Sequence, residues 1–183
     1  MTWQPTPGSA ADLSEDADPE QVARTIALRR LESAPRTRAE LAKTLAQRGV
    51  PDAAADAVLD RFEEVGLIDD AAFAHAWVTT RHAGRGLGRR ALSEELRRRG
   101  IAPDLIESAC ATLDAEDERV RARQLADRKV ASMRGLDHRK AMSRLAGMLA
   151  RRGYSASLAY EVAREALSDA ETDSSSTEIG FTT

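Results

Sequence analysis

Apolar residues recur along this chain at intervals of three and four, as where Ala55, Val58, Leu59 and Phe62 fall on one face of a predicted helix. No segment shows the strict alternation of apolar and polar residues that half-buried strands require. The pattern therefore predicts an all-α protein. The expected helices cover residues 19–33, 37–48, 52–64, 69–83, 88–99, 103–113, 116–133, 138–152 and 155–168.

Residues that start and stop helices flank these segments. Asp18 precedes Pro19, which favours a helix cap followed by proline at the first helical position. Pro35 ends that helix, because a residue before proline avoids the α region. Thr37 and Glu40 match the capping box that opens the next helix. The local signals thus agree with the apolar pattern.

Three stretches repeat one pattern of leucine, arginine and glycine. Aligned on the glycines, they place leucines eight and four residues before the glycine, arginine directly before it and an apolar residue directly after it. The aligned sets are Leu41, Leu45, Arg48, Gly49 and Val50; Leu92, Leu96, Arg99, Gly100 and Ile101; and Leu145, Leu149, Arg152, Gly153 and Tyr154. Glycine suits the left-handed end of a helix, and two leucines one turn apart form a core stripe.

The glycines are separated by 51 and 53 residues, which leaves room for three helices in each repeat. We therefore expect an elongated, curved array of three tandem three-helix repeats with a leading N-terminal helix. The predicted segments are an acidic disordered tail at 1–18, the leading helix at 19–34, repeats at 35–84, 85–135 and 136–168, and a second acidic disordered tail at 169–183.

Composition narrows the class of protein. Only 4% of the residues are aromatic, and no apolar run reaches the roughly 18 residues that span a bilayer. The N-terminus lacks the basic and apolar regions of a secretory signal, and Cys110 is the single cysteine. We expect a soluble, cytoplasmic monomer that does not act at a membrane.

The net charge of −3 hides an asymmetry. Residues 1–20 and 165–183 each carry five acids and no lysine or arginine, so residues 21–164 hold all 27 basic residues against 20 acidic ones. That basic excess of about seven charges favours a polyanionic partner. A solvated surface of helical ion pairs explains the same composition, and both interpretations stay open.

The most specific motif runs Gly66-Leu67-Ile68-Asp69-Asp70 and continues with Phe73-Ala74. With the junction that leads into Ala91-Leu92 and the run Glu95–Ile101, it resembles the RecX family of regulators of the RecA recombinase, over roughly residues 20–168. The physical interpretation of the motif is structural. Asp69 and Asp70 can cap a helix that Ile68, Phe73 and Trp77 anchor on the first repeat.

The resemblance implies a protein that is not an enzyme and needs no cofactor. Family members bind RecA filaments on single-stranded DNA, lie in the helical groove of the filament, and restrain its ATP hydrolysis, strand exchange and co-protease function. RecA filaments are therefore the expected partner, and weak nonspecific DNA binding is a further expectation.

Residues that could carry chemistry do not assemble into a catalytic pattern. The stretch GRGLGRR at 84–90 lacks the Gly-Lys-Ser/Thr of a phosphate-binding loop and follows no predicted strand. His75 and His82 lie seven residues apart without a cysteine, so exposed helical histidines explain them better than a metal site does. Cys110 sits in an apolar stripe and is expected in the core. We predict no catalytic, cofactor or metal residues.

Two basic clusters are the candidate partner contacts. The first contains Arg81, Arg85, Arg89, Arg90, Arg97, Arg98 and Arg99, and the second contains Arg134, Arg139, Lys140, Arg144, Arg151 and Arg152. Helix-end arginines and pairs such as Glu94–Arg98 account for some of them at a few tenths of a kcal/mol each. Arg85, Arg89 and Arg90 precede or open a helix, where the dipole disfavours cations, so they are the preferred contacts.

A helix-turn-helix DNA-binding protein is the alternative from another class. Each repeat has a helix, a glycine turn and a second helix, but the second helix carries acids that would repel phosphates. On the helix after the first glycine turn these acids are Asp52, Asp56, Asp60, Glu63 and Glu64. After the second glycine turn they are Asp104, Glu107 and Asp114. A general helical-repeat adaptor is the third possibility.

Overall fold

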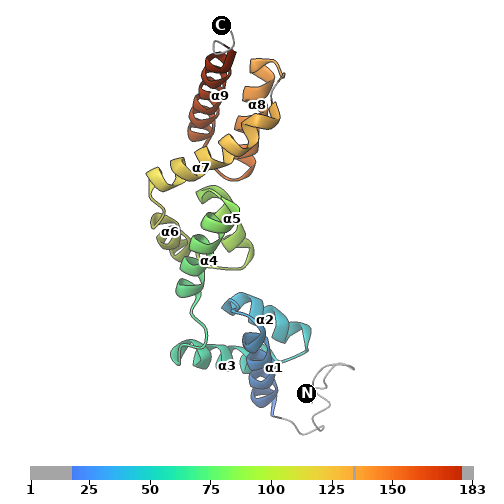
Figure 1. Ribbon diagram of the computed structural model, residues 1–183. Coiled ribbons are helices and arrows are strands. Elements are labelled where there is room, and N and C mark those ends of the chain that lie inside the picture. The colour runs from blue at the N-terminus through green and yellow to red at the C-terminus, as the bar shows by residue number, and fades with distance from the viewer. Residues whose placement is uncertain (1–17, 134, 179–183) are drawn as a thin grey trace. The chain divides into compact units, whose positions relative to one another are not determined.

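The computed structural model describes residues 18–133 and 135–178 (Figure 1). Within these ranges the chain forms α-helices and no strand, which confirms the all-α prediction. The helices are α1 Pro19–Ser33, α2 Arg38–Gln47, α3 Asp52–Glu64, α4 Asp70–Arg85, α5 Arg89–Arg98, α6 Pro103–Ala111, α7 Ala115–Val130, α8 His138–Arg151 and α9 Ala156–Glu178, with a 3₁₀ turn at Ala131–Met133. Most boundaries lie within two residues of the predicted ones.

The chain divides into two compact units. The first contains the residues up to Ala76 together with Leu96–Ile106, and the second contains Trp77–Glu95 together with the chain from Glu107 onward. Helices α4, α5 and α6 therefore contribute residues to both units. Each unit has a hydrophobic core of its own.

In the first unit, α1, α2 and α3 pack against one another. Leu41, Leu45 and Leu59 are almost wholly buried between them, and Phe62 and Ile68 extend the same cluster. Alanines of α1 and α3 belong to the same buried cluster. Apolar residues spaced three and four apart bury one face of each helix, at about 25 cal/mol per Å² of apolar surface removed from water.

In the second unit, α7, α8 and α9 pack in the same way. Leu145, Leu149 and Tyr154 are fully buried, with Ala122 and Ala126 of α7 and Val162 of α9 against them. The alanines bring the helices close together. This core supports the surface on which the candidate site lies.

The three aligned glycines adopt one conformation. Gly49, Gly100 and Gly153 have φ of 75°, 78° and 90°, the left-handed region in which a Cβ is strained. In each case the following N–H donates to the carbonyl of the second repeat leucine, from Val50 to Leu45 at 3.1 Å and equivalently at Ile101 and Tyr154. These bonds define a Schellman ending, so the internal repeat is present in three dimensions.

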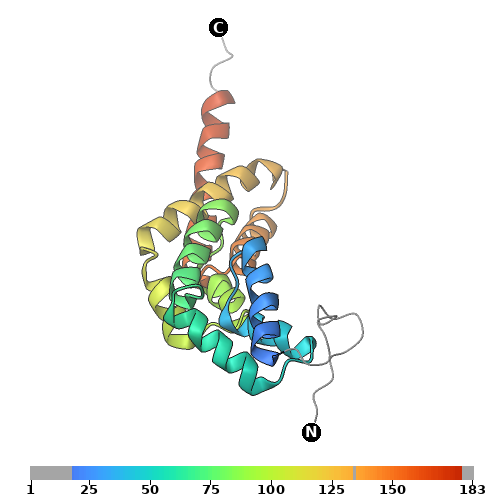
Figure 2. The same cartoon turned by 90° about the horizontal axis from the view of Figure 1, so that it is seen from below.

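Helix α9 corrects the predicted C-terminal tail. We expected disorder from residue 169, but α9 continues to Glu178, and its last turns extend past α7 and α8 (Figure 2). Arg123 donates to Asp169 at 2.6 Å, and His138 Nδ1 lies 2.9 Å from Glu171 Oε1, so neighbouring helices hold the first turn of that extension. Of the predicted N-terminal tail, residues 1–17 lie outside the described residues. Asp18 caps α1 by accepting from the Glu20 N–H at 3.1 Å.

Candidate functional site

The GRGLGRR stretch forms a joint in the second unit. It closes α4, turns at Gly86 with φ of 61° and opens α5. The Gly88 N–H donates to the Arg152 carbonyl at 2.8 Å, and the Arg90 N–H donates to the Gly153 carbonyl at 3.2 Å. The turn between α4 and α5 is therefore bonded directly to the turn between α8 and α9, which contains the third repeat glycine, Gly153.

Tyr154 fastens the same joint from inside. Its hydroxyl donates to the Gly86 carbonyl at 3.0 Å, and the side chain is fully buried. Burial raises the pKa of Tyr154 to about 12, and the charge of Glu118 acts in the same direction. The phenol consequently keeps its proton and its hydrogen bond at neutral pH.

Two arginines close the C-terminal end of α4. Arg121 of α7 donates to the Ala83 carbonyl, and Arg152 donates to the Arg85 carbonyl. Carbonyls at a helix C-terminus lack partners within the helix and carry partial negative charge, so guanidinium groups suit them. These contacts bring cations from α7 and from the end of α8 to the end of α4.

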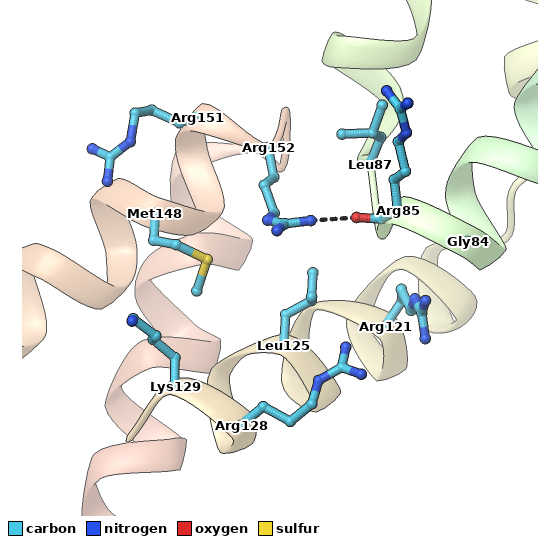
Figure 3. A pocket seen from close by; sticks show the side chains of 10 residues that line it. All are labelled: Gly84, Arg85, Leu87, Arg121, Leu125, Arg128, Lys129, Met148, Arg151 and Arg152. Atoms are coloured by element: carbon cyan, nitrogen blue, oxygen red, sulfur yellow. Dashed lines mark hydrogen bonds between the residues drawn. The ribbon is translucent and has the colours of Figure 1, made fainter. Parts of the chain in front are cut away.

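A basic pocket of about 840 Å³ opens at this point (Figure 3). Its lining residues come from the end of α4 and the turn after it, from α7, and from the end of α8. They are Gly84, Arg85, Leu87, Arg121, Leu125, Arg128, Lys129, Met148, Arg151 and Arg152. Six of these ten residues are basic and none is acidic. Leu125 and Met148 point toward the centre between the cations, so charge surrounds an apolar floor (Figure 3).

Several acids of the C-terminal helices pair with arginines outside the pocket. On another face of α7, Arg119 donates to Glu165 at 2.6 Å, and Arg123 donates to Asp127 and Asp169 at 2.7 and 2.6 Å. Those bonds raise the pKa of the Arg123 guanidinium further. By contrast, the side chains of Arg85, Arg128, Lys129 and Arg151 form no ion pair with any residue of 18–133 and 135–172. Helix α7 therefore carries ion-paired arginines on one face and the unpaired cations Arg128 and Lys129 on the face that lines the pocket.

The three preferred arginines have different surroundings. Arg85 lines the basic pocket. Arg89 is bonded to other residues of the protein: its backbone N–H donates to Glu118 at 2.8 Å, and its guanidinium donates to the Leu113 carbonyl at 2.6 Å. Glu118 supplies the negative charge that the start of α5 needs, which explains a cation at that position. Arg90 is exposed and does not line the pocket.

The other basic candidates are dispersed. Arg81 stacks over the Trp77 ring at 4.0 Å from its centroid. Arg97 and Arg98 are exposed on α5, in the part of that helix that belongs to the first unit. Exposed positions of α8 carry Arg139, Lys140 and Arg144, and only Arg151 of that group joins Arg152 in the pocket. Arg134 lies outside the described residues.

Three pocket residues escaped the sequence reasoning. Arg121, Arg128 and Lys129 belong to neither sequence cluster, because α7 also carries several acids that lower its local basic density. A helical projection would have found them, since with Leu125 they recur at intervals of three and four and share one face. Local charge counts miss such a face because acids and bases alternate around the helix.

The residues of the family motif have structural contacts. Asp69 accepts from the Ala72 N–H at 2.7 Å at the start of α4. Asp70 accepts from the Arg38 N–H at 3.0 Å, at the start of α2. Burial raises the pKa of Asp70, and the N–H and charge of Arg38 oppose that rise. Gly66 has φ of 72°, and Leu67 is 48% exposed.

The aromatic residues of the motif region lie in different units. Phe73 lies in the first unit, where the Arg99 guanidinium is 5.5 Å from its ring centroid. Trp77 lies in the second unit, where its indole N–H donates to Glu95 at 2.9 Å. Arg81 also stacks on the Trp77 ring, and the anchoring of α4 on the first repeat by Trp77 stays a prediction.

Arg99 links two repeats in the first unit. Its guanidinium donates to Glu40 at 2.5 Å, and its carbonyl accepts from the Thr37 hydroxyl at 2.7 Å. Arg152, which holds the same place in the next repeat, reaches back to Arg85. The arginine before each of these glycines is therefore more than a helix-end residue, because it contacts the preceding repeat.

His82 and Cys110 have contacts within the protein. His82 Nδ1 lies 2.8 Å from the Leu87 carbonyl, and Cys110 is 4% exposed beside the Ser93 hydroxyl. Among the described residues, no three His, Cys, Asp or Glu side chains gather as metal ligands would. No helix in the described part of the chain is long and apolar enough to cross a membrane.

Tandem three-helix domains with glycine turns define a helical-repeat protein, and comparisons identify which kind. The chain matches the descriptions "RecX, first three-helix domain" at residues 23–62, "RecX, second three-helix domain" at 69–109 and "RecX, third three-helix domain" at 116–163. These spans start the period at α1, whereas the glycine spacing starts it at α2. A period of three helices permits either phase, and our segment boundaries stay a prediction.

Individual relatives agree. Regulatory protein RecX from Streptomyces coelicolor is 53% identical over 165 residues, which cover 90% of this chain and 88% of that protein. The protein of the same name from Thermobifida fusca is 55% identical over 145 residues, covering 79% and 78%. The crystal structure of RecX from Lactobacillus salivarius has the same fold, with a TM-score of 0.76, 19% identity and coverage of 81% and 97%. The chain belongs to the RecX family of regulatory proteins.

Proposed function

We propose that this protein is a non-enzymatic regulator that binds RecA filaments on single-stranded DNA and restrains their ATP hydrolysis, strand exchange and co-protease activity. Membership of the RecX family carries the proposal, since relatives named regulatory proteins match nearly the whole chain. The protein acts in the cytoplasm as a monomer. It lies in the helical groove of the filament. Binding there restrains RecA without any reaction catalysed by this protein.

The basic pocket supports a polyanionic partner. Four of its cations have no carboxylate partner among residues 18–133 and 135–172. Binding of an anionic surface to such a cluster of unpaired positive charges lowers the electrostatic free energy. A RecA filament on DNA offers such a surface. Exposed cations outside the pocket, such as Arg90 and Arg98, add to the same attraction.

The helix-turn-helix alternative is disfavoured by the helix that would read DNA. On α3, Asp56, Asp60 and Glu63 surround the single guanidinium of Arg38, and all three acids are exposed. A surface with several carboxylates for one arginine repels the major groove. A general helical-repeat adaptor has the same fold, but that alternative does not account for the match to the RecX family, which implies RecA as the partner.

A titration of RecA tests the proposal. RecA is incubated with single-stranded DNA and ATP, and its ATP hydrolysis is followed while this protein is added from substoichiometric to equimolar amounts. We expect hydrolysis to fall progressively with the added protein. Reactions without DNA give the background, and cosedimentation with preformed filaments reports binding separately. Unchanged hydrolysis with a folded protein and active RecA would sink the proposal.

A further inference from the structure

We propose that the basic pocket binds the phosphate backbone of a nucleic-acid strand directly, so that the chain carries a nucleic-acid site of its own in addition to any contact with RecA protein. The proposed function enters this assignment at one point only: it identifies the bound strand as the DNA of the RecA filament. The pocket and its chemistry are properties of the second unit alone.

The first argument is that two of the six cations are bonded within the protein and four are unpaired. The guanidiniums of Arg121 and Arg152 are fixed by carbonyls at the end of α4, so they give the pocket a constant positive wall. Arg85, Arg128, Lys129 and Arg151 have no ion-pair partner among residues 18–133 and 135–172 and remain available to a ligand. A charge cluster of this kind adds nothing to folding, because unpaired like charges repel.

One atom in the wall also lacks a partner. Arg121 Nε is buried and makes no hydrogen bond with the described part of the protein, although the two terminal nitrogens of that side chain do. A guanidinium has five N–H donors in a fixed plane and can bond phosphate oxygens with two of them at once. Because this Nε is buried, Arg121 offers a phosphate its positive charge and no hydrogen bond from that atom.

The second argument concerns the class of ligand. Protein–protein interfaces bury aromatic anchors at their centre, where charged residues other than arginine are depleted. None of the ten lining residues is aromatic and six are cationic, which matches the strongly positive, polar interfaces that proteins form with nucleic acids. The lining comes almost wholly from helices, whose backbone N–H groups are already bonded, so an extended acidic peptide cannot add to it as a strand.

The lining also predicts how the strand is read. Bases are usually held on aromatic side chains, and the pocket offers only Leu87, Leu125 and Met148 as apolar surface. Recognition therefore depends on phosphates and is independent of sequence. If each of the four unpaired cations neutralises one phosphate, the slope of log K against log salt concentration is about −3 for a single strand.

A pair of triple variants tests the site without RecA. Arg128→Gln, Lys129→Gln and Arg151→Gln remove three unpaired pocket cations that take no part in the hydrogen bonds of the joint. Arg139→Gln, Lys140→Gln and Arg144→Gln remove three exposed cations of α8 outside the pocket and change the net charge equally. Circular dichroism confirms that both variants fold. Fluorescence anisotropy then measures binding of a labelled oligothymidine, of a random duplex and of polyglutamate, each over a salt series.

The proposal expects the wild-type protein to bind nucleic acid, and the pocket variant to bind it on the order of tenfold more weakly with the salt slope reduced by about 2. The control variant should stay within about twofold of the wild type, the difference a general loss of charge produces. The ratio of single-strand to duplex affinity identifies which source of phosphates the pocket prefers.

Three results overturn the assignment: no nucleic-acid binding by the wild type, equal losses in both variants, or tighter binding of polyglutamate than of DNA. The last result would assign the pocket to an acidic protein surface. Because RecA is absent, these outcomes are independent of the ATP hydrolysis titration. Inhibition of RecA by a protein that fails the DNA test would leave the proposed function standing and remove only the pocket's ligand.

Discussion

Replacing Gly88 by alanine tests whether the joint between α4–α5 and α8–α9 holds the second unit together. A Cβ on Gly88 would lie 2.8 Å from the carbonyl carbon and oxygen of Gly153 and from the nitrogen of Tyr154. All three are backbone atoms, so a side-chain rotation cannot relieve the clash. The turns must separate, and the hydrogen bonds from Gly88 to Arg152 and from Arg90 to Gly153 lengthen.

The magnitude follows from these terms. Overpacking against a fixed neighbour costs about 1–3 kcal/mol, and two weakened hydrogen bonds add about 0.5–1.5 kcal/mol each. The lower entropy of the unfolded alanine chain offsets about 0.4–1 kcal/mol. We expect the free energy of unfolding to fall by about 3 kcal/mol, measured by urea denaturation followed by circular dichroism.

Gly84→Ala is the matched control, because nothing lies within 4 Å of a Cβ at that position in α4. Alanine favours a helix over glycine by up to about 1 kcal/mol, so this variant should be as stable as the wild type or slightly more stable. Amide hydrogen exchange at Gly88 and Arg90 should accelerate only in Gly88→Ala. If Gly88→Ala unfolds within about 0.5 kcal/mol of the wild type, the joint does not depend on close backbone approach.

Two further predictions concern single contacts. Tyr154→Phe should lower the unfolding free energy by about 1 kcal/mol at neutral pH, because the Gly86 carbonyl loses its donor. Since the folded pKa of about 12 lies above that of an unfolded tyrosine, the wild type loses stability as the pH rises from about 10 toward 12, and urea denaturation across that range should show the two proteins converging; a constant difference would contradict this reasoning. A double-mutant cycle of Arg99→Ala and Glu40→Ala should give a coupling energy of about 1 kcal/mol, because the pair is only about a quarter exposed; additive effects would show that the contact does not join the repeats.

The helices and their ends were predictable from local sequence. Thr37 and Glu40 form the capping box that their spacing indicates, with the Glu40 N–H 3.1 Å from the Thr37 hydroxyl. The repeat glycines were equally readable, because a left-handed helix end has few alternatives to glycine. The end of α9 was missed because Arg123 and His138, which hold Asp169 and Glu171, come from other helices.

The candidate site was only partly predictable. Clusters of arginine in sequence suggested Arg85 and Arg151, which line the pocket, but also Arg89, which is bonded to Glu118 and the Leu113 carbonyl. Sequence density cannot separate a free cation from a paired one. The distinction depends on which acid a folded neighbour supplies, and Glu118 lies 29 residues away from Arg89.

The sequence by itself determined the all-α class, the three-helix period and the family, since each rests on residues within one turn or one repeat of each other. Tertiary structure alone decided what GRGLGRR does. Gly86 and Gly88 became a joint because Arg152, Gly153 and Tyr154 dock on them. The pocket beside that joint exists because α4, α7 and α8 bring together six cations that are far apart in the sequence. Periodicity records which face of a helix is buried, but only packing determines which charged faces meet.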